Sequence, residues 1–225
     1  FLSRAQEIGL IGTWELDIAK NELLWTDENY RIFGLPPGTA LTYEIFLSCV
    51  HPEDREYVDT KWTAAMAGEP YDIEHRLLVD GEIKWVNEKA ELEFDNEGNC
   101  IRGTGFTQDV TDRKLADDAL RVSEERLRRA INEAPFPIMI HAENGEVIQI
   151  SAVWTELTGY ERDEISTIAD WTERAYGDRQ STAIEAIDRL YSLNTRVEEG
   201  DWPIRTKSGQ EIVWQFSSAP LGQLP

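Results

Sequence analysis

Short runs of alternating apolar and polar residues open the chain. Two such runs, over residues 12–18 and 22–25, flank Lys20 and Asn21, a polar pair that is typical of a hairpin turn. A short helix is then predicted from Asp27, which is a candidate N-cap. The pattern therefore predicts a two-stranded hairpin followed by short helical turns.

A longer helix is predicted next. Pro52 suits the first turn of a helix, where a backbone N–H is not needed. Glu53 and Asp54 suit the positive end of the helix dipole. We therefore predict a helix over residues 52–67, closed by Gly68.

The period of the apolar positions changes to two after residue 70. Three strands are predicted over residues 71–77, 83–94 and 100–110, with a tight turn at Asp80-Gly81 between the first two. Together with the opening hairpin, they describe an antiparallel sheet of about five strands with helices on one face. The predicted fold class is α+β.

The following stretch has the spacing of a helix with heptads. From about residue 111 to residue 134, small and apolar residues recur at alternating intervals of four and three. Leu120, Leu127 and Ala130 belong to this seam and are the candidate dimer contacts. Two interpretations stay open, a weak coiled coil with a second copy of the chain or an amphipathic helix packed on its own domain.

After this helix the order of elements repeats. Two short strands, a short helix ending near Gly159, a longer helix and two further strands follow in the same sequence as before. We therefore predict a first domain over residues 1–112, a helical linker over 113–134 and a second domain over 135–225. The second domain is expected to lack its last strand.

Composition narrows the classes of partner. The 225 residues include 43 acidic and 22 basic side chains, and the formal net charge of -21 repels nucleic acid and anionic membranes. No apolar stretch approaches the roughly 18 to 20 residues that span a bilayer. We expect a cytoplasmic segment excised from a longer protein, whose membrane association stays open.

Three motifs resemble the PAS family of sensory domains. They are His51-Pro52-Glu53-Asp54-Arg55, then Asp80-Gly81-Glu82-Ile83-Lys84-Trp85-Val86, and above all Gly105-Phe106-Thr107-Gln108-Asp109-Val110-Thr111-Asp112-Arg113-Lys114. The last is similar to the Asp-x-Thr signature by which PAS domains lead into a following helix. The second half is a poorer match, because Tyr176-Gly177 replaces His-Pro before Asp178-Arg179.

The resemblance implies a role in signalling. Such tandem modules lie upstream of an output domain in the same chain, such as a two-component histidine kinase or a diguanylate cyclase. They sense a small molecule or a redox state and pass a change through helical linkers. We expect this chain to form a homodimer through the helix over residues 110–134. Asp109, Thr111, Asp112 and Arg76 are the implied relay residues, and we expect a salt bridge from Asp109 to Arg76 or Lys84.

The candidate ligand residues lie in the second half. If a pocket exists between its long helix and its sheet, His141, Tyr176, Trp202 and Trp214 would line it. Packing in the core explains most of the eight Trp residues without a ligand. The cofactor is unknown: the predicted long helices carry no His for haem, and neither cysteine lies in a flavin-adduct motif, although noncovalent flavin stays open.

No motif for enzyme chemistry is present in the sequence, since it lacks a phosphate-binding loop, a nucleophile elbow and a zinc-protease helix. The sequence thus predicts a sensory and signal-relay module that is not itself an enzyme. Two alternatives stay open. One is a ligand-free module for dimerisation and spacing, and the other is a flavin or haem sensor of light or redox state.

Overall fold

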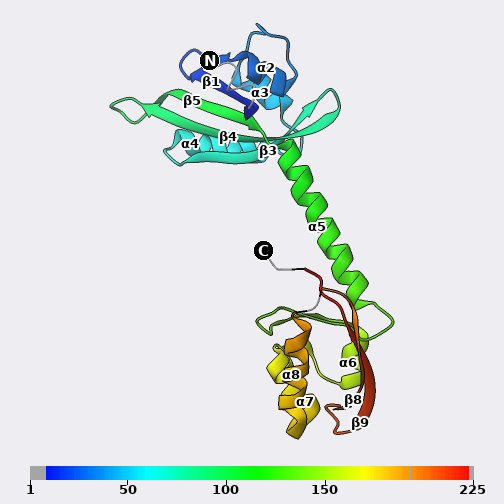
Figure 1. Cartoon of the computed structure of the whole chain (residues 1–225). Coiled ribbons are helices and arrows are strands. Elements are labelled where there is room, and N and C mark those ends of the chain that lie inside the picture. Colours follow the sequence, from blue (N-terminus) through cyan, green and yellow to red (C-terminus); the bar gives the residue numbers. More distant parts are fainter. Residues whose placement is uncertain (1–8, 193, 223–225) are drawn as a thin grey trace. The chain divides into compact units, whose positions relative to one another are not determined.

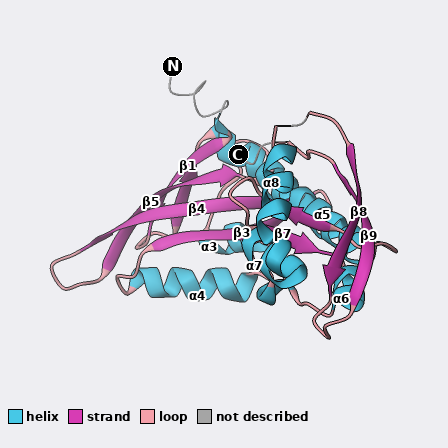
Figure 2. Ribbon diagram, turned by 60° about the horizontal axis from the view of Figure 1, so that its bottom comes forward, coloured by secondary structure: helices cyan, strands magenta, loops and turns pink. Residues whose placement is uncertain are grey.

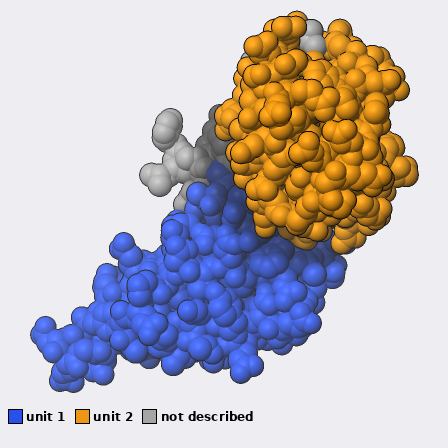
Figure 3. Space-filling model, turned by 90° about the horizontal axis from the view of Figure 1, so that it is seen from below, with its two compact units in different colours: residues 1–120 blue, residues 121–225 orange. Residues whose placement is uncertain are grey.

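The computed structural model describes residues 9–192 and 194–222. The chain divides into two compact units, Phe1–Leu120 and Arg121–Pro225 (Figure 3). The first eight residues and the last three, which fall in the predicted first and second domains, lie outside the described residues. The predicted domain boundaries at residues 112 and 134 stay a prediction, because the helix between the domains belongs partly to each unit.

The first unit is an α+β layer built on a five-stranded antiparallel sheet with the order β2-β1-β5-β4-β3 (Figures 1 and 2). This arrangement confirms the predicted fold class. In chain order the elements are β1 (Ile11–Asp17), β2 (Glu22–Trp25), α2 (Asp27–Phe33), α3 (Tyr43–Cys49), α4 (Arg55–Met66), β3 (Tyr71–Val79), β4 (Glu82–Phe94) and β5 (Cys100–Asp109).

One face of this sheet carries the hydrophobic core. Along β3 the residues alternate between buried and more exposed positions, as expected for a strand with one covered face. Helix α4 runs beside β3 (Figure 2), and its buried residues Val58 and Trp62 belong to the same core as Leu77 and Val86. Side chains at every second position of a strand therefore face the helices, and the alternate positions face outward.

Glycines in β5 allow the ring of Trp14 to pack unusually close to the backbone of the sheet on its inner face. The indole of Trp14 on β1 lies against Gly103 and Gly105 on the neighbouring strand. A Cβ placed on Gly105 would lie 2.6 Å from Cζ2 of Trp14 and 2.2 Å from the backbone oxygen of Lys89. Only a residue without a Cβ fits this position, since real Cβ contacts do not come below 3.0 Å.

Two helix starts differ from the prediction. Helix α4 begins at Arg55, three residues after the predicted start at Pro52, because His51-Pro52-Glu53-Asp54 forms a turn that docks on β3 instead. The carboxylate of Asp54 makes no cap and accepts hydrogen bonds from Arg76. Helix α2 has Thr26 rather than Asp27 at its N-cap.

Helix α5 (Thr111–Asn132) follows β5 directly and none of its side chains is buried. Leu120 and Leu127 are 60% and 63% exposed. The first turn contacts the outer face of the first sheet, and the seam further along is free of contacts that bury it. Packing on its own domain, one of the two open interpretations, therefore does not account for the heptad seam.

The second unit repeats the plan with two separate hairpins. Its described residues form two two-stranded antiparallel sheets, β6-β7 and β8-β9, in place of one five-stranded sheet. The elements are β6 (Met139–His141), β7 (Val147–Ile150), α6 (Ala152–Thr158), η1 (Arg162–Glu164), α7 (Ile168–Tyr176), η2 (Gly177–Arg179), α8 (Gln180–Leu190), β8 (Val197–Arg205) and β9 (Glu211–Ser218). In the described part of the chain, no helix is long and apolar enough to cross a membrane.

Candidate functional site

An aromatic cavity lies on the inner face of the first sheet. Its volume is about 30 Å³, which exceeds the 10 to 15 Å³ or so that one ordered water needs. Side chains of β1, β2, β3, β4, α3 and α4 form its wall. The lining residues are Trp14, Leu16, Leu23, Trp25, Tyr43, Phe46, Trp62, Tyr71 and Glu88.

Glu88 is the one charged residue in this lining, and its side chain is 3% exposed. It lies on β4 at an inward position, directly opposite Thr107 of β5. The Thr107 hydroxyl donates to Oε1 over 2.8 Å, and the Tyr71 hydroxyl donates to Oε2 over 3.4 Å. Nε2 of the buried His75 lies 3.3 Å from Oε2, within ion-pair distance but not aligned as a hydrogen bond.

The rings around the cavity contact one another at right angles or in stacks. Trp62 is central: its ring lies 6.0 Å from Trp14 and 5.3 Å from Tyr71, both edge to face, and it stacks on Tyr43 at 5.8 Å. Such contacts fix ring orientations as well as burying apolar area. Within the described residues, the indole N–H of Trp14 is buried without a hydrogen-bond partner.

The electrostatic environment of the cavity is negative. Burial raises the pKa of Tyr43, and the carboxylates of Asp59, Glu88 and Glu44 raise it further. Burial also raises the pKa of Tyr71 well above its ordinary value, with Glu88 as the next contributor. Both phenols are therefore neutral at physiological pH, and the charge they face is that of carboxylates.

A second set of contacts ties helix α5 to β4. The Thr111 hydroxyl donates to Oδ1 of Asp109 and accepts from the backbone N–H of Trp85 over 3.0 Å. The backbone N–H of Thr111 also donates to Asp109 over 2.9 Å, and that of Val110 donates to the Trp85 oxygen over 2.9 Å. The predicted relay residues Asp109 and Thr111 thus meet at the corner between β5 and α5.

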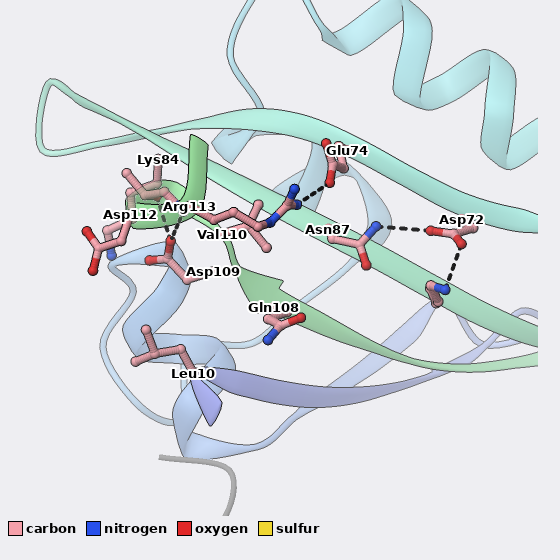
Figure 4. A pocket seen from close by; sticks show the side chains of 12 residues that line it. Leu10, Asp72, Glu74, Lys84, Asn87, Gln108, Asp109, Val110, Asp112 and Arg113 are labelled. Atoms are coloured by element: carbon pink, nitrogen blue, oxygen red, sulfur yellow. Dashed lines mark hydrogen bonds and ion pairs between the residues drawn. The ribbon is translucent and has the colours of Figure 1, made fainter. Parts of the chain in front are cut away.

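The first turn of α5 also holds the outer face of the sheet. Arg113 and Lys114 both pair with Glu74 of β3, and these two cations lower the pKa of Glu74, Lys114 contributing most. The ammonium of Lys114 lies 5.1 Å from the ring centroid of Trp85. An open depression of about 590 Å³ lies beside this corner, and Asp112 is at its rim (Figure 4).

The expected salt bridge from Asp109 to Arg76 or Lys84 is wrong. Asp109 accepts from Thr111, whereas Arg76 donates to Asp54 from its backbone N–H over 2.9 Å and from Nε over 3.0 Å. Lys84 donates to backbone oxygens at the end of α2 instead. The Arg76 guanidinium lies 5.9 Å from the ring centroid of Trp85, the residue whose backbone hydrogen-bonds at the corner between β5 and α5.

The four ligand candidates of the second unit separate into two groups. Trp202 and Trp214 lie opposite each other in the β8-β9 register, and Tyr176 contacts Trp202 edge to face at 5.8 Å. His141 lies with Tyr191, whose hydroxyl is 3.0 Å from its Nδ1, and burial lowers the pKa of His141. A shared ligand site for all four stays a prediction.

Glu88 and His75 were not among the predicted site residues. Both lie at positions that alternate in phase with apolar, inward residues of the same strands, Val86 for Glu88 and Ile73 for His75. A charged or titratable residue at an inward strand position is the signal that would have found them, because such a group is buried only with partners.

The fold of the first unit is that of a small sensory domain. Its antiparallel sheet and helices enclose a small cavity, and its last strand leads directly into helix α5. A family model described as "PAS fold" matches residues 22–107, and a second, described as "PAS domain", matches residues 125–190. The chain therefore belongs to the PAS family and contains two PAS domains in series. PAS domains are regulatory sensors rather than catalysts, and this chain is a signal-sensing module.

The chain matches segments of larger curated proteins. The chain is 23% identical over 99% of its length to a probable diguanylate cyclase DgcE of Escherichia coli, and 26% identical over 67% of its length to the sensor protein FixL of Bradyrhizobium diazoefficiens. A blue-light-activated histidine kinase of Brucella ovis is 33% identical over 49% of the chain. The matches cover 20%, 30% and 22% of these three relatives.

Among solved structures, the chain is similar to a sensory box histidine kinase/response regulator from Burkholderia thailandensis. It is 29% identical, with a TM-score of 0.48, and the match covers 57% of this chain and 98% of that one.

Proposed function

We propose that the first PAS domain receives the signal in its aromatic cavity and passes it through the β4-α5 corner to an output domain elsewhere in the parent protein. The observation that supports this most directly is the alternation along β4. Glu88 faces the cavity, and Trp85, three residues earlier, has its side chain on the outer face while its backbone N–H donates to the Thr111 hydroxyl. A shift of β4 caused by a ligand therefore moves the start of α5.

The same alternation holds on β3. His75 lies on the inner face beside Glu88, while the neighbouring Glu74 holds Arg113 and Lys114 on the outer face. Two adjacent strands thus connect the cavity to the first turn of α5. A ligand shifts this arrangement only by its difference in affinity for the two states of the corner, which is the general condition for coupling.

Native mass spectrometry of freshly purified protein tests the sensing role. We expect a co-purifying small molecule whose mass is lost when the protein is denatured. Protein that is always free of ligand, and whose α5 shows the same hydrogen exchange under all added metabolites, would contradict the proposal. That outcome would favour the ligand-free dimerisation and spacing module.

Removing the carboxylate at the corner tests the relay contact. In the Asp109→Ala variant, Thr111 loses the acceptor for its N–H and its hydroxyl, at a cost of about 1 kcal/mol that is typical of a lost helix cap. We expect hydrogen exchange in the first turn of α5 to become about fivefold faster. Asp117→Ala, an exposed carboxylate one turn later, is the control and leaves that turn unchanged.

We further propose that α5 forms the homodimer contact through Leu120, Leu127 and Ala130. Light scattering should give a mass that rises above 25.8 kDa with concentration. The double change Leu120→Asp and Leu127→Asp should return the mass to that of the monomer, because charges would then face each other across the seam. Leu115→Asp is the matched control, since Leu115 is 63% exposed but lies off the seam.

A dimeric mass that persists in the double variant would place the contact elsewhere. A monomeric wild type at all concentrations would remove the dimer proposal altogether.

A flavin or haem does not fit the first domain as its side chains stand. Pockets for ligands of drug size begin near 300 Å³, about ten times the volume of this cavity. Helix α4 carries no His that could bind haem iron. The residues present therefore favour a compact ligand in this domain.

A further inference from the structure

The inner cavity has a composition that selects for charge. Aromatic rings from five elements surround a single buried carboxylate, and neither Lys nor Arg is in the lining. Because an ionised carboxylate is costly to bury without a counter-charge, a positive group placed beside Glu88 is favoured by its charge. Among the described residues, His75 is the one basic side chain within ion-pair distance of Glu88, and it carries a charge only when protonated.

Each oxygen of the Glu88 carboxylate already accepts one hydrogen bond from a hydroxyl group. Oε1 accepts from Thr107, and Oε2 faces the Tyr71 hydroxyl and the His75 ring. Because a hydroxyl group already donates to each oxygen, the negative charge can attract an incoming group that donates no hydrogen bond of its own. Alkylated ammonium groups carry charge without strong donors, and they are attracted to the faces of Trp and Tyr rings.

The approach to the cavity favours cations as well. Tyr43 is only half-buried at the edge of the lining, and its hydroxyl donates to Asp59 over 3.2 Å. Glu44 and Asp59 add to the negative environment that Glu88 creates around this ring. The whole chain, with its net charge of -21, attracts cations and repels anions.

We infer that the first domain binds a small organic cation, with an alkylated ammonium head against Glu88 and enclosed by the rings of Trp14, Tyr43, Trp62 and Tyr71. This inference rests on the proposed function, since it names the class of ligand for the same cavity. The unpartnered indole N–H of Trp14 is a donor for an oxygen atom on such a ligand. A head of this size requires the half-buried Trp25 and Tyr43 rings to move apart.

Tetramethylammonium chloride and tert-butanol are the probes, because they have nearly the same shape and differ in charge. Titration calorimetry on the whole chain should show tetramethylammonium binding at least about tenfold more tightly than tert-butanol. Sodium chloride at equal ionic strength controls for salt. Equal affinities, or no binding of tetramethylammonium, would overturn the inference.

Two variants locate the site. Glu88→Gln keeps the shape and the acceptor oxygen but removes the charge, and it should weaken tetramethylammonium binding by about tenfold or more while leaving tert-butanol unaffected. Glu91→Gln removes a charge from an exposed position of the same strand and should change neither affinity. Equal losses in both variants would show a nonspecific attraction and overturn the inference.

Hydrogen exchange in α5, followed in the same titrations, separates this inference from the proposed function. Charge-selective binding that leaves the first turn of α5 unchanged would support the cation site and contradict the relay. Binding of tert-butanol as tight as that of tetramethylammonium, with slower exchange in α5, would support the relay and contradict the cation site.

Discussion

We expect Gly105→Ala to destabilise the first domain by about 3 kcal/mol or more, the upper part of the range for overpacking a core. The added Cβ would lie 2.2 Å from the backbone oxygen of Lys89 on β4 and 2.6 Å from the Trp14 ring. A ring can move, but the backbone of a central strand can shift only by breaking its ladder. The substitution should therefore loosen β4 and β5 together.

Hydrogen exchange read by mass spectrometry measures this effect separately for each domain. Peptides of β4 and β5 should exchange faster in Gly105→Ala, while those of β8 and β9 in the second unit stay unchanged and serve as an internal reference. Thr104→Ala, at the adjacent outward position of the same strand, is the matched control with an expected change within about 1 kcal/mol. Similar behaviour of the two variants would show that the close contact at Gly105 is relaxed in solution.

We expect Asp54→Asn to cost about 2 kcal/mol near neutral pH, within the range for hydrogen bonds to charged groups. The Asp54 carboxylate accepts from the backbone N–H and Nε of Arg76 and pairs with its Nη2, and this contact docks the start of α4 on the edge of the sheet. Hydrogen bonds from the Arg76 side chain hold the pKa of Asp54 below its usual value of 3.8.

The pH dependence has a defined sign. A lowered pKa in the folded state means that this stabilisation is fully present above the unfolded pKa of about 4 and is lost as the pH falls through the folded value. The difference in unfolding free energy between wild type and Asp54→Asn should therefore shrink below about pH 4. Urea unfolding at several pH values measures it.

Glu53→Gln is the control for the Asp54 prediction. Glu53 also pairs with Arg76, but its side chain is 73% exposed, whereas that of Asp54 is 16% exposed. An exposed pair contributes about 0.2 to 1 kcal/mol. If the two variants lose the same stability at neutral pH, the buried hydrogen bonds of Asp54 are not the cause.

The strands of the first domain could be predicted because burial there follows the pleat. The inward positions of β3 are two residues apart, and the structure buries each of the residues that the pattern placed there: Tyr71, Ile73, His75 and Leu77. The corner at Thr111 was also predictable, since its motif combines a strand end with a helix start. Local patterns of this kind are sufficient to predict a strand or helix when one of its faces is buried and the other is exposed to solvent.

Helix α7, which was not among the predicted elements, has a local signal at its start. Thr167 and Asp170 form a capping box at its start, a pattern visible in the sequence. The late start of α4 was not predictable in this way, because Asp54 is drawn to Arg76, 22 residues further along the chain. Competition between a local cap and a distant partner depends on the packing of the whole domain.

The candidate site was the least predictable part. Trp14, Trp62 and Tyr71 come from three separated elements, and only the folded sheet brings them around Glu88. In the sequence these residues are indistinguishable from ordinary core aromatics. The two buried titratable residues, His75 and Glu88, would have pointed to this domain, because inward strand positions seldom carry such groups without a role.

Side chains alternate between the inner and outer faces along β3 and β4, so mutations in these strands fall into two groups. Under the proposed function, substitutions at the inward positions of His75 and Glu88 would alter what is detected. Substitutions at the outward positions of Glu74 and Trp85, whose side chains contact the first turn of α5, would alter how strongly detection is reported. On that proposal, a protein of this family could come to detect a new ligand through changes at the inward positions while its contacts with α5 stay the same. In protein engineering, ligand selectivity would then be changed at the inward positions of these two strands, and the strength of the response at the outward positions.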